Sequence, residues 1–523
     1  MMKIYCGSAI IISFVGLILI WAWKLLNWAW LKPKKLEKQL REQGLNGNSY
    51  RPLYGDLKDN FKMRDEAREK PIPFTNDYIT RVLPFLHQHV AKYGQNCFTW
   101  LGPVPTINIT QPELIREVFT RINEFQKART NPLIRLLVPG LVSLEGEKWA
   151  MHRKLINPAF HMEKLKLMLP AFRASVTELT DKWENSMSET GSSELDVWPD
   201  ITNLTADVIS RAAFGSSFEE GRRIFELLKE QTQMTIRLFQ SFYIPGWKYV
   251  PTKNNRQMKK INEDIQGLLK GIIDKRKKAM DAGEAAKNDL LGILMESNIK
   301  ETRLSQSHGN NKRLLMSFRD MIDECKLFYF AGQETTSVLL VWTMILLSKH
   351  QDWQMKAREE ILSVFGQNLP DVDGVNHLKS VTMILYEVLR LYPPLLAVSR
   401  RIYDQDTMLC NNLCVPEGAM VSLSIYQVHH DPKLWGDDVN EFKPDRFSEG
   451  ILKATKGNLS FFPFIGGPRI CIGQNFALVE AKIALAMLLQ RFSFELSPSY
   501  THAPTTSVTL QPQYGAHLIV RRL

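Results

Sequence analysis

One short segment, residues 463–477, combines a cysteine, glycines and an arginine at spacings that suit a metal-binding thiolate. The fixed positions of its pattern, F-x-x-G-x-R-x-C-x-G, are Phe464, Gly467, Arg469, Cys471 and Gly473. Glycines keep the backbone close to a bound group, so the thiol of Cys471 can reach a metal without hindrance. A helix-like run follows at 475–489, and its N-terminal amides together with Arg469 should lower the pKa of that thiol. A lone cysteine is more often a small buried apolar residue, but the complete pattern favours a ligand.

Two further motifs carry charged or hydroxyl side chains. Glu387 and Arg390 are three positions apart, which puts both on one face of a helix, although this spacing alone is weak evidence. Residues 331–336, AGQETT, place Glu334 and Thr335 within an otherwise apolar stretch, where an ionisable group is costly and usually has a task. The structural alternative for Thr335 is a hydrogen bond to a carbonyl of its own helix, which is common.

The order and spacing of these motifs resemble the cytochrome P450 family. The segment 463–477 is similar to the family's signature loop, and the Glu387-x-x-Arg390 pair is followed by Arg446 in a Pro-Asp-Arg-Phe tetrapeptide, as in the family. Within the cytochrome P450 family, the chain resembles the plant family that includes secologanin synthase and triterpenoid oxidases. The segments that carry this resemblance are GLNGNSYRPLYGDL, NPAFHMEKLKLMLPAF, ECKLFYFAGQETT and CIGQNFALVEAK.

The resemblance implies a site for haem b, with Cys471 as the axial ligand of the haem iron. A thiolate in that place favours cleavage of the O–O bond. Further cofactor-binding positions carried over from the family are Phe464, Trp149, Arg153, Arg400 and Arg469. The arginines suit haem propionates because a guanidinium is a planar fork, and the adjacent Arg401 could serve in place of Arg400.

The same resemblance assigns roles to the other two motifs. Thr335 would hydrogen-bond dioxygen or its water, Glu334 would relay protons, and Gly332 would let the helix open near the ligand. Glu387, Arg390 and Arg446 would form a buried ion network that holds the haem loop, which is a structural role.

The function implied by the resemblance is that of a monooxygenase. Such an enzyme uses O2 and electrons from an NADPH-dependent P450 reductase to oxidise an apolar plant metabolite, here a terpenoid of the triterpenoid or iridoid class. No nucleotide-binding glycine loop is evident, which agrees with an external electron donor. Two alternatives remain: a haem-thiolate isomerase or lyase with the same fold, and a non-enzymatic haem carrier. The intact Glu334–Thr335 pair speaks against both.

The elements that must position these residues are mostly helices. A long helix is expected at 317–350, and because it is apolar nearly all round it should be a buried central helix, its polar centre arguing against a membrane span. Strand-like runs occur at 97–101, 106–109, 419–425, 492–496 and 508–510. The sequence therefore predicts a mostly α (α+β) fold, with a helical haem domain and small antiparallel sheets.

The N-terminus is predicted to be a transmembrane anchor. Residues 4–23 carry no charge, and twenty residues of helix span the hydrocarbon core of a bilayer. Lysines and arginines follow from Lys32 to Arg41, which predicts that the catalytic domain faces the cytosol, on the endoplasmic reticulum membrane. A cleaved signal peptide is the alternative, but its shorter apolar stretch and small-residue cleavage site do not fit.

Charge and composition set the remaining limits. We expect an anchor at 1–31, a basic and polar linker at 32–55 and one haem-thiolate domain at 56–523. The net charge of +11 suits an anionic membrane surface, and no nucleic-acid-binding signature accompanies it. Six cysteines in 523 residues are too few for a disulfide framework. His152, His429 and His430 are predicted to be surface or packing residues, because the axial position is already assigned.

Overall fold

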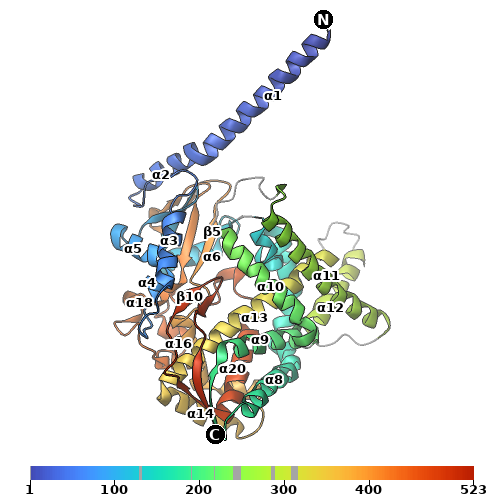
Figure 1. Ribbon diagram of the computed structural model, residues 1–523, viewed down its shortest axis with the longest axis vertical. Coiled ribbons are helices and arrows are strands. Elements are labelled where there is room, and N and C mark those ends of the chain that lie inside the picture. The colour runs from blue at the N-terminus through green and yellow to red at the C-terminus, as the bar shows by residue number, and fades with distance from the viewer. Residues whose placement is uncertain are drawn as a thin grey trace. The chain divides into compact units, whose positions relative to one another are not determined.

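The computed structural model describes residues 2–128, 132–189, 191–216, 218–239, 249–283, 289–307 and 316–523 (Figure 1). The chain divides into two compact units. The smaller unit consists of Met1–Ala67, Leu83–Ala128 and Ser399–Ser424, and the larger unit of Arg68–Val82, Arg129–Val398 and Ile425–Leu523. Apart from Arg400, the residues predicted to form the site belong to the larger unit.

The smaller unit begins with the apolar helix α1 (Met2–Leu26), which continues through a π-helical turn at Asn27–Leu31 into α2 (Lys32–Glu42). Most large apolar side chains from Ile12 to Leu31 are exposed. The continuous helix from Ile12 to Glu42 is long and apolar enough to cross a membrane. An N-terminal apolar helix suited to membrane anchoring is therefore present, and the residues that follow it directly are helical.

The main sheet of the smaller unit has the strand order β1-β2-β8-β5-β3. These strands are β1 (Phe98–Leu101), β2 (Val104–Ile109), β8 (Met420–Ser424), β5 (Ala397–Arg401) and β3 (Gln126–Lys127). β2 is antiparallel to β1 and parallel to β8. The remaining elements are α3 (Leu57–Arg68), α5 (Pro84–Tyr93), α6 (Pro112–Thr120), β6 (Thr407–Met408) and β7 (Cys414–Val415).

The larger unit is mostly helical (Figure 1). Its longer helices are α7 (Gly146–Ile156), α8 (Met162–Asn185), α9 (Val197–Phe214), α10 (Phe218–Phe239), α11 (Lys253–Asp281), α12 (Leu290–Ser307), α13 (Phe318–Lys349), α14 (Gln351–Phe365), α16 (Lys379–Leu391) and α20 (Gln474–Arg491). Shorter ones are α4 (Ile79–Val82), α15 (Val372–His377), α17 (Ile425–His429), α18 (Pro432–Trp435) and α19 (Ile451–Ala454).

Two small antiparallel sheets complete the larger unit. One joins β4 (Ser192–Asp196), β12 (His517–Arg522) and β9 (Phe492–Leu496), and the other is the hairpin of β10 (Pro504–Thr506) and β11 (Leu510–Pro512). The prediction of a strand at 508–510 holds only for Leu510, the first residue of β11, because residues 507–509 form the bend between β10 and β11. A bend that carries Val508 next to the first residue of β11 has the same short apolar pattern as a strand.

Helix α13 is the central element of the larger unit and agrees with the predicted helix at 317–350. It starts with a capping box, in which Ser317 and Asp320 satisfy each other's backbone amides. Its residues are buried from Glu324 to Phe330 and from Thr336 to Leu347, so it is a core helix. Between these stretches, residues 331–335 are only half-buried. This interruption coincides with the AGQETT motif.

Candidate active site

Cys471 lies in a tight loop, three residues before the start of α20 at Gln474. A 3-10 turn at Gly467–Arg469 precedes it, and its backbone amide donates to the carbonyl of Phe464 at 2.9 Å. Ile465 and Gly467 have φ values of +65° and +67°, and the left-handed region is favourable for the glycine. The backbone therefore holds Cys471 in place independently of its side chain.

The Cys471 thiol is surrounded by protein atoms, yet the residue is exposed by its accessible surface. Burial raises the pKa of this thiol, whereas the amide of Gly473 and the charge of Arg153 lower it. The residue nonetheless has a large accessible surface. The cation acting on the thiol is Arg153, so the expectation that Arg469 lowers its pKa is not met.

Arg153 and Trp149 lie on α7, on the face next to the cysteine loop. Arg153 donates from Nη1 to the carbonyl of Ile470 at 2.7 Å. The guanidinium of Arg469 stacks on the ring of Trp149, 4.7 Å from its centroid, and forms an ion pair with Glu145. Among the described residues, nothing accepts from the buried Nε of Arg469. A buried donor in this position is suited to an anionic group.

Phe464 and Arg400 occupy different surroundings. Phe464 is half-buried and accepts the amide of Cys471 through its carbonyl. Arg400 is buried on β5 in the smaller unit, where it donates to the carbonyl of Ser399 at 3.0 Å. The structure thus brings Trp149, Arg153 and Arg469 to the cysteine loop, whereas a role for Arg400 at the haem stays a prediction.

The half-buried stretch of α13 is bounded by residues that approach α20. Phe160 contacts both Phe328 of α13 and Phe476 of α20, with ring centroids 5.8 and 6.3 Å apart. Beyond the stretch, Thr336 lies beside Glu480 of α20, and burial raises the pKa of that carboxyl. Because α20 begins directly after the cysteine loop, residues 331–335 border the same region of the larger unit as Cys471.

Thr335 and Glu334 of the AGQETT motif have defined side-chain partners, and Gly332 packs closely against α9. Thr335 donates to the carbonyl of Ala331 at 2.8 Å, which is the internal helix bond considered as its structural alternative. Glu334 accepts from Thr509 and Gln511, and burial raises the pKa of its carboxyl. A Cβ on Gly332 would lie 2.8 Å from Cδ1 of Ile209 on α9. Gly332 is therefore needed for close packing of α9 on α13, which the predicted helix opening did not anticipate.

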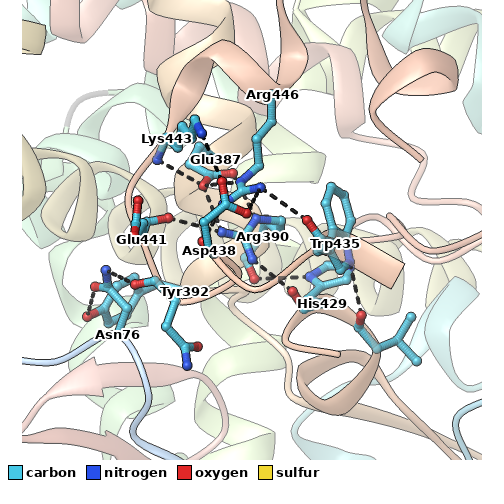
Figure 2. A network of polar contacts seen from close by, with 12 residues as sticks. Asn76, Glu387, Arg390, Tyr392, His429, Trp435, Asp438, Glu441, Lys443 and Arg446 are labelled. Atoms are coloured by element: carbon cyan, nitrogen blue, oxygen red, sulfur yellow. Dashed lines mark hydrogen bonds and ion pairs between the residues drawn. The ribbon is translucent and has the colours of Figure 1, made fainter. Parts of the chain in front are cut away.

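Glu387, Arg390 and Arg446 form the ion network that the sequence predicts (Figure 2). The guanidinium of Arg390 donates two hydrogen bonds to the carboxylate of Glu387, at 2.8 and 2.7 Å, and both side chains are fully buried. Arg446 donates to the same carboxylate at 3.3 Å and pairs with Asp438 at 2.6 Å. Arg390 also donates to the carbonyls of His429 and Glu441, Arg446 donates to the carbonyls of Trp435 and Asp438, and the amide of Lys443 donates to Glu387.

Two buried histidines connect these parts, and sequence reasoning missed both connections. The Nδ1 of His152 on α7 lies 2.5 Å from Glu324 on α13. His429 contacts the carbonyl of Arg390 through Nδ1 and accepts the amide of Phe462 at 3.2 Å through Nε2. Burial and the charge of Arg390 lower the pKa of His429 to about 3, so it stays neutral. His429 thereby links the ion network to the loop that precedes Cys471.

The Cytochrome P450 family model matches residues 80–519. The chain belongs to the cytochrome P450 family. An echinocystic acid 23-monooxygenase from Saponaria officinalis is 60% identical over 508 residues, which cover 97% of both chains. Cytochrome P450 CYP72A219 from Panax ginseng is 55% identical and covers 97% of both chains.

A solved structure supports the P450 fold. The retinoic-acid-bound cyanobacterial CYP120A1 has a TM-score of 0.72 and 24% sequence identity, covering 86% of this chain and 96% of that one. The resemblance to P450 enzymes and to the triterpenoid-oxidase group is thus confirmed, as is the mostly helical fold with small sheets.

The family establishes a P450 monooxygenase that uses haem iron and O2. The isomerase or lyase and the haem carrier are therefore set aside. The residues present fit such a group. Cys471 is accessible, Arg469 has a buried donor for an acidic substituent, and residues 331–335 of α13 are only half-buried.

Proposed function

We propose that this P450 oxidises a terpenoid, with a triterpenoid as the first candidate, and that it receives electrons from an NADPH-dependent P450 reductase. The observation that carries the substrate class is the 60% identity to an enzyme named for echinocystic acid, which extends over almost the whole length of both chains. An apolar polycyclic substrate also suits a site whose helix α13 is otherwise lined by apolar side chains.

The test of this proposal is a substrate panel. The full-length chain is co-expressed with a plant P450 reductase and supplied with echinocystic acid, other triterpenoids and an iridoid, and products are detected by mass spectrometry. We expect an oxygenated triterpenoid that depends on both NADPH and the reductase. Oxidation of the iridoid alone would contradict the triterpenoid assignment, and turnover without the reductase would contradict the electron source.

Each residue at the site has a proposed task. Haem b, when bound through the sulfur of Cys471, supplies the iron chemistry that activates oxygen. Trp149, Arg153 and Arg469 hold its propionates, and Phe464 packs at the loop, with Arg400 as a further propionate partner. The network around Arg390 keeps the cysteine loop in position. Arg390 donates to the carbonyl of His429, and the ring of His429 accepts the backbone amide of Phe462, which precedes the loop.

Thr335 and Glu334 are proposed to deliver protons. Glu334 has a pKa raised by burial, so its carboxyl can hold a proton closer to neutral pH than an exposed carboxyl can. The hydroxyl of Thr335 donates to the carbonyl of Ala331, and it would be free to donate to a reactant beside α13 after giving up this one internal bond. Both residues lie in the half-buried stretch of α13, which is where α13 leaves room for a reactant.

Replacement of Thr335 by alanine should uncouple electron use from product formation. NADPH consumption should continue while product per NADPH falls roughly 10-fold, since a positioned proton donor is worth at least that much. A matched control is Thr343→Ala, because Thr343 makes the same kind of bond to Leu339 in the fully buried part of α13. Unchanged coupling in Thr335→Ala, or equal loss in the control, would contradict the assigned role.

We further propose an anchor at 1–31, a linker at 32–55 and a haem domain at 56–523 that faces the cytosol at the endoplasmic reticulum. Deletion of residues 2–26 removes α1 but keeps the bond from the Tyr50 hydroxyl to the carbonyl of Ala29. The shortened protein should move from the carbonate-washed membrane pellet to the soluble fraction and keep its haem spectrum. The exposed Asn458, which begins an Asn-Leu-Ser sequon, provides the topology control. A glycan removable by endoglycosidase at Asn458 would contradict the cytosolic orientation.

A further inference from the structure

The carboxyl of Glu334 is held by the hairpin of β10 and β11. Its Oε1 accepts from the hydroxyl of Thr509 and from the amide of Gln511, both at 2.6 Å. The amide of Gln511 also approaches the Thr509 hydroxyl at 3.3 Å, so the three side chains form one cluster. Within the described part of the chain, no hydrogen bond reaches Oε2 of Glu334.

The backbone that carries the two donors is itself fixed. Leu510, which lies between them, donates its amide to the carbonyl of Pro394 at 3.0 Å and accepts from the indole of Trp342 at 2.9 Å. Trp342 belongs to α13, the helix that carries Glu334, so donors and acceptor are positioned by the same core. Thr509 is 2% exposed, and water therefore competes little for its hydroxyl.

Two donors on one oxygen have two physical effects. They favour the ionised carboxyl and so oppose the burial that raises the pKa of Glu334. They also fix one oxygen of the carboxyl and leave the other to exchange protons. A proton donor that can rotate freely delivers its proton less often to the reacting group, because the productive geometry is rarer.

We propose that Thr509 and Gln511 are positioning residues for proton delivery, which bind Oε1 of Glu334 and thereby leave Oε2 as the oxygen that gains and releases protons. This inference rests on the proposed proton-relay role of Glu334. It assigns to the C-terminal hairpin a part in coupling electron use to product formation, in addition to closing the core against Trp342.

The test compares Thr509→Val, which replaces the hydroxyl with a methyl group, with Thr509→Ser, which keeps the hydroxyl. The matched control is Thr505→Val, since Thr505 is the cross-strand partner of Gln511 on the same hairpin and makes no side-chain hydrogen bond among the described residues. Each variant is assayed with the best acceptor of the triterpenoid panel for product per NADPH, hydrogen peroxide and spectrally titrated substrate affinity.

We expect Thr509→Val to lower product per NADPH roughly 10-fold, the order of one lost hydrogen bond to a charged group, and Gln511→Met to act in the same direction. Substrate affinity should change less than about twofold, since a positioning role does not require contact with the substrate. Thr509→Ser and Thr505→Val should resemble the wild type. A loss of affinity in Thr509→Val without uncoupling would overturn the inference in favour of a substrate contact.

The same measurements in a Glu334→Ala background separate this inference from the proposed role of Glu334. Without the carboxyl, Thr509→Val should have no further effect on coupling. If Glu334→Ala uncouples but Thr509→Val does not, or if the two losses multiply, the hairpin is not acting through Glu334 and the inference is wrong. If Glu334→Ala leaves coupling unchanged, the relay role itself is wrong and the inference falls with it.

Discussion

Replacement of Cys471 by alanine should abolish product formation and the red-shifted absorption that a thiolate-bound haem shows when it is reduced and exposed to carbon monoxide. The methyl group of alanine offers no electron pair to the iron, and oxygen activation depends on that thiolate. The loop itself should survive, because the amide of residue 471 bonds to the carbonyl of Phe464 and does not involve the side chain. The loss should therefore be chemical, with the fold intact.

The control for this experiment is Cys410→Ala, which removes an exposed cysteine from the smaller unit. It should keep both the spectrum and the activity. Circular dichroism of Cys471→Ala should show unchanged helix content, which separates a missing ligand from a misfolded protein. If Cys471→Ala retained the carbon monoxide spectrum, another residue would be the axial ligand and the site would have to be reassigned.

Replacement of Arg390 by methionine should destabilise the haem domain by about 3–5 kcal/mol, because it leaves the buried carboxylate of Glu387 without its main partner. Arg390 makes two bonds to Glu387 and further bonds to the carbonyls of His429 and Glu441. Loss of these contacts frees the segment that holds Phe462 in front of the cysteine loop. We expect a lower urea midpoint for unfolding and loss of haem during purification.

Two comparisons make this prediction specific. The double variant Glu387→Gln with Arg390→Met should recover part of the lost stability, since it no longer strands a charge in the core. Lys453→Met provides the control, because Lys453 pairs with Glu449 at the surface, where ion pairs contribute little. An Arg390→Met protein with wild-type stability and full haem content would show that the network does not support the site.

Sequence patterns within a single helix or loop correctly predicted several elements of this protein. The apolar run of α13 and its capping box define a long helix between Phe318 and Lys349, and the prediction of 317–350 agrees with it. The spacing around Cys471 predicted a loop before a helix, and α20 begins at Gln474. The i, i+3 spacing of Glu387 and Arg390 predicted their contact, since one turn of helix brings both side chains together.

Contacts between distant segments were not visible in the sequence. Arg469 was expected to act on the thiol, yet it pairs with Glu145, 324 positions away, and Arg153 is the cation that acts on Cys471. Gly332 was expected to loosen α13, yet it admits Ile209 of α9. No spacing rule relates such pairs, because their separation along the chain is set by the path of the fold.

The sequence by itself determined the family and the main helices, because motif spacing and periodicity are local properties of the chain. Only the tertiary structure decided which side chains hydrogen-bond to the carboxyl of Glu334. Thr509 and Gln511 reach Glu334 across 175 and 177 positions, and His429 reaches Phe462 across 33. Such contacts exist only after the core has packed, since hydrogen bonds between distant segments require both backbones to be fixed first.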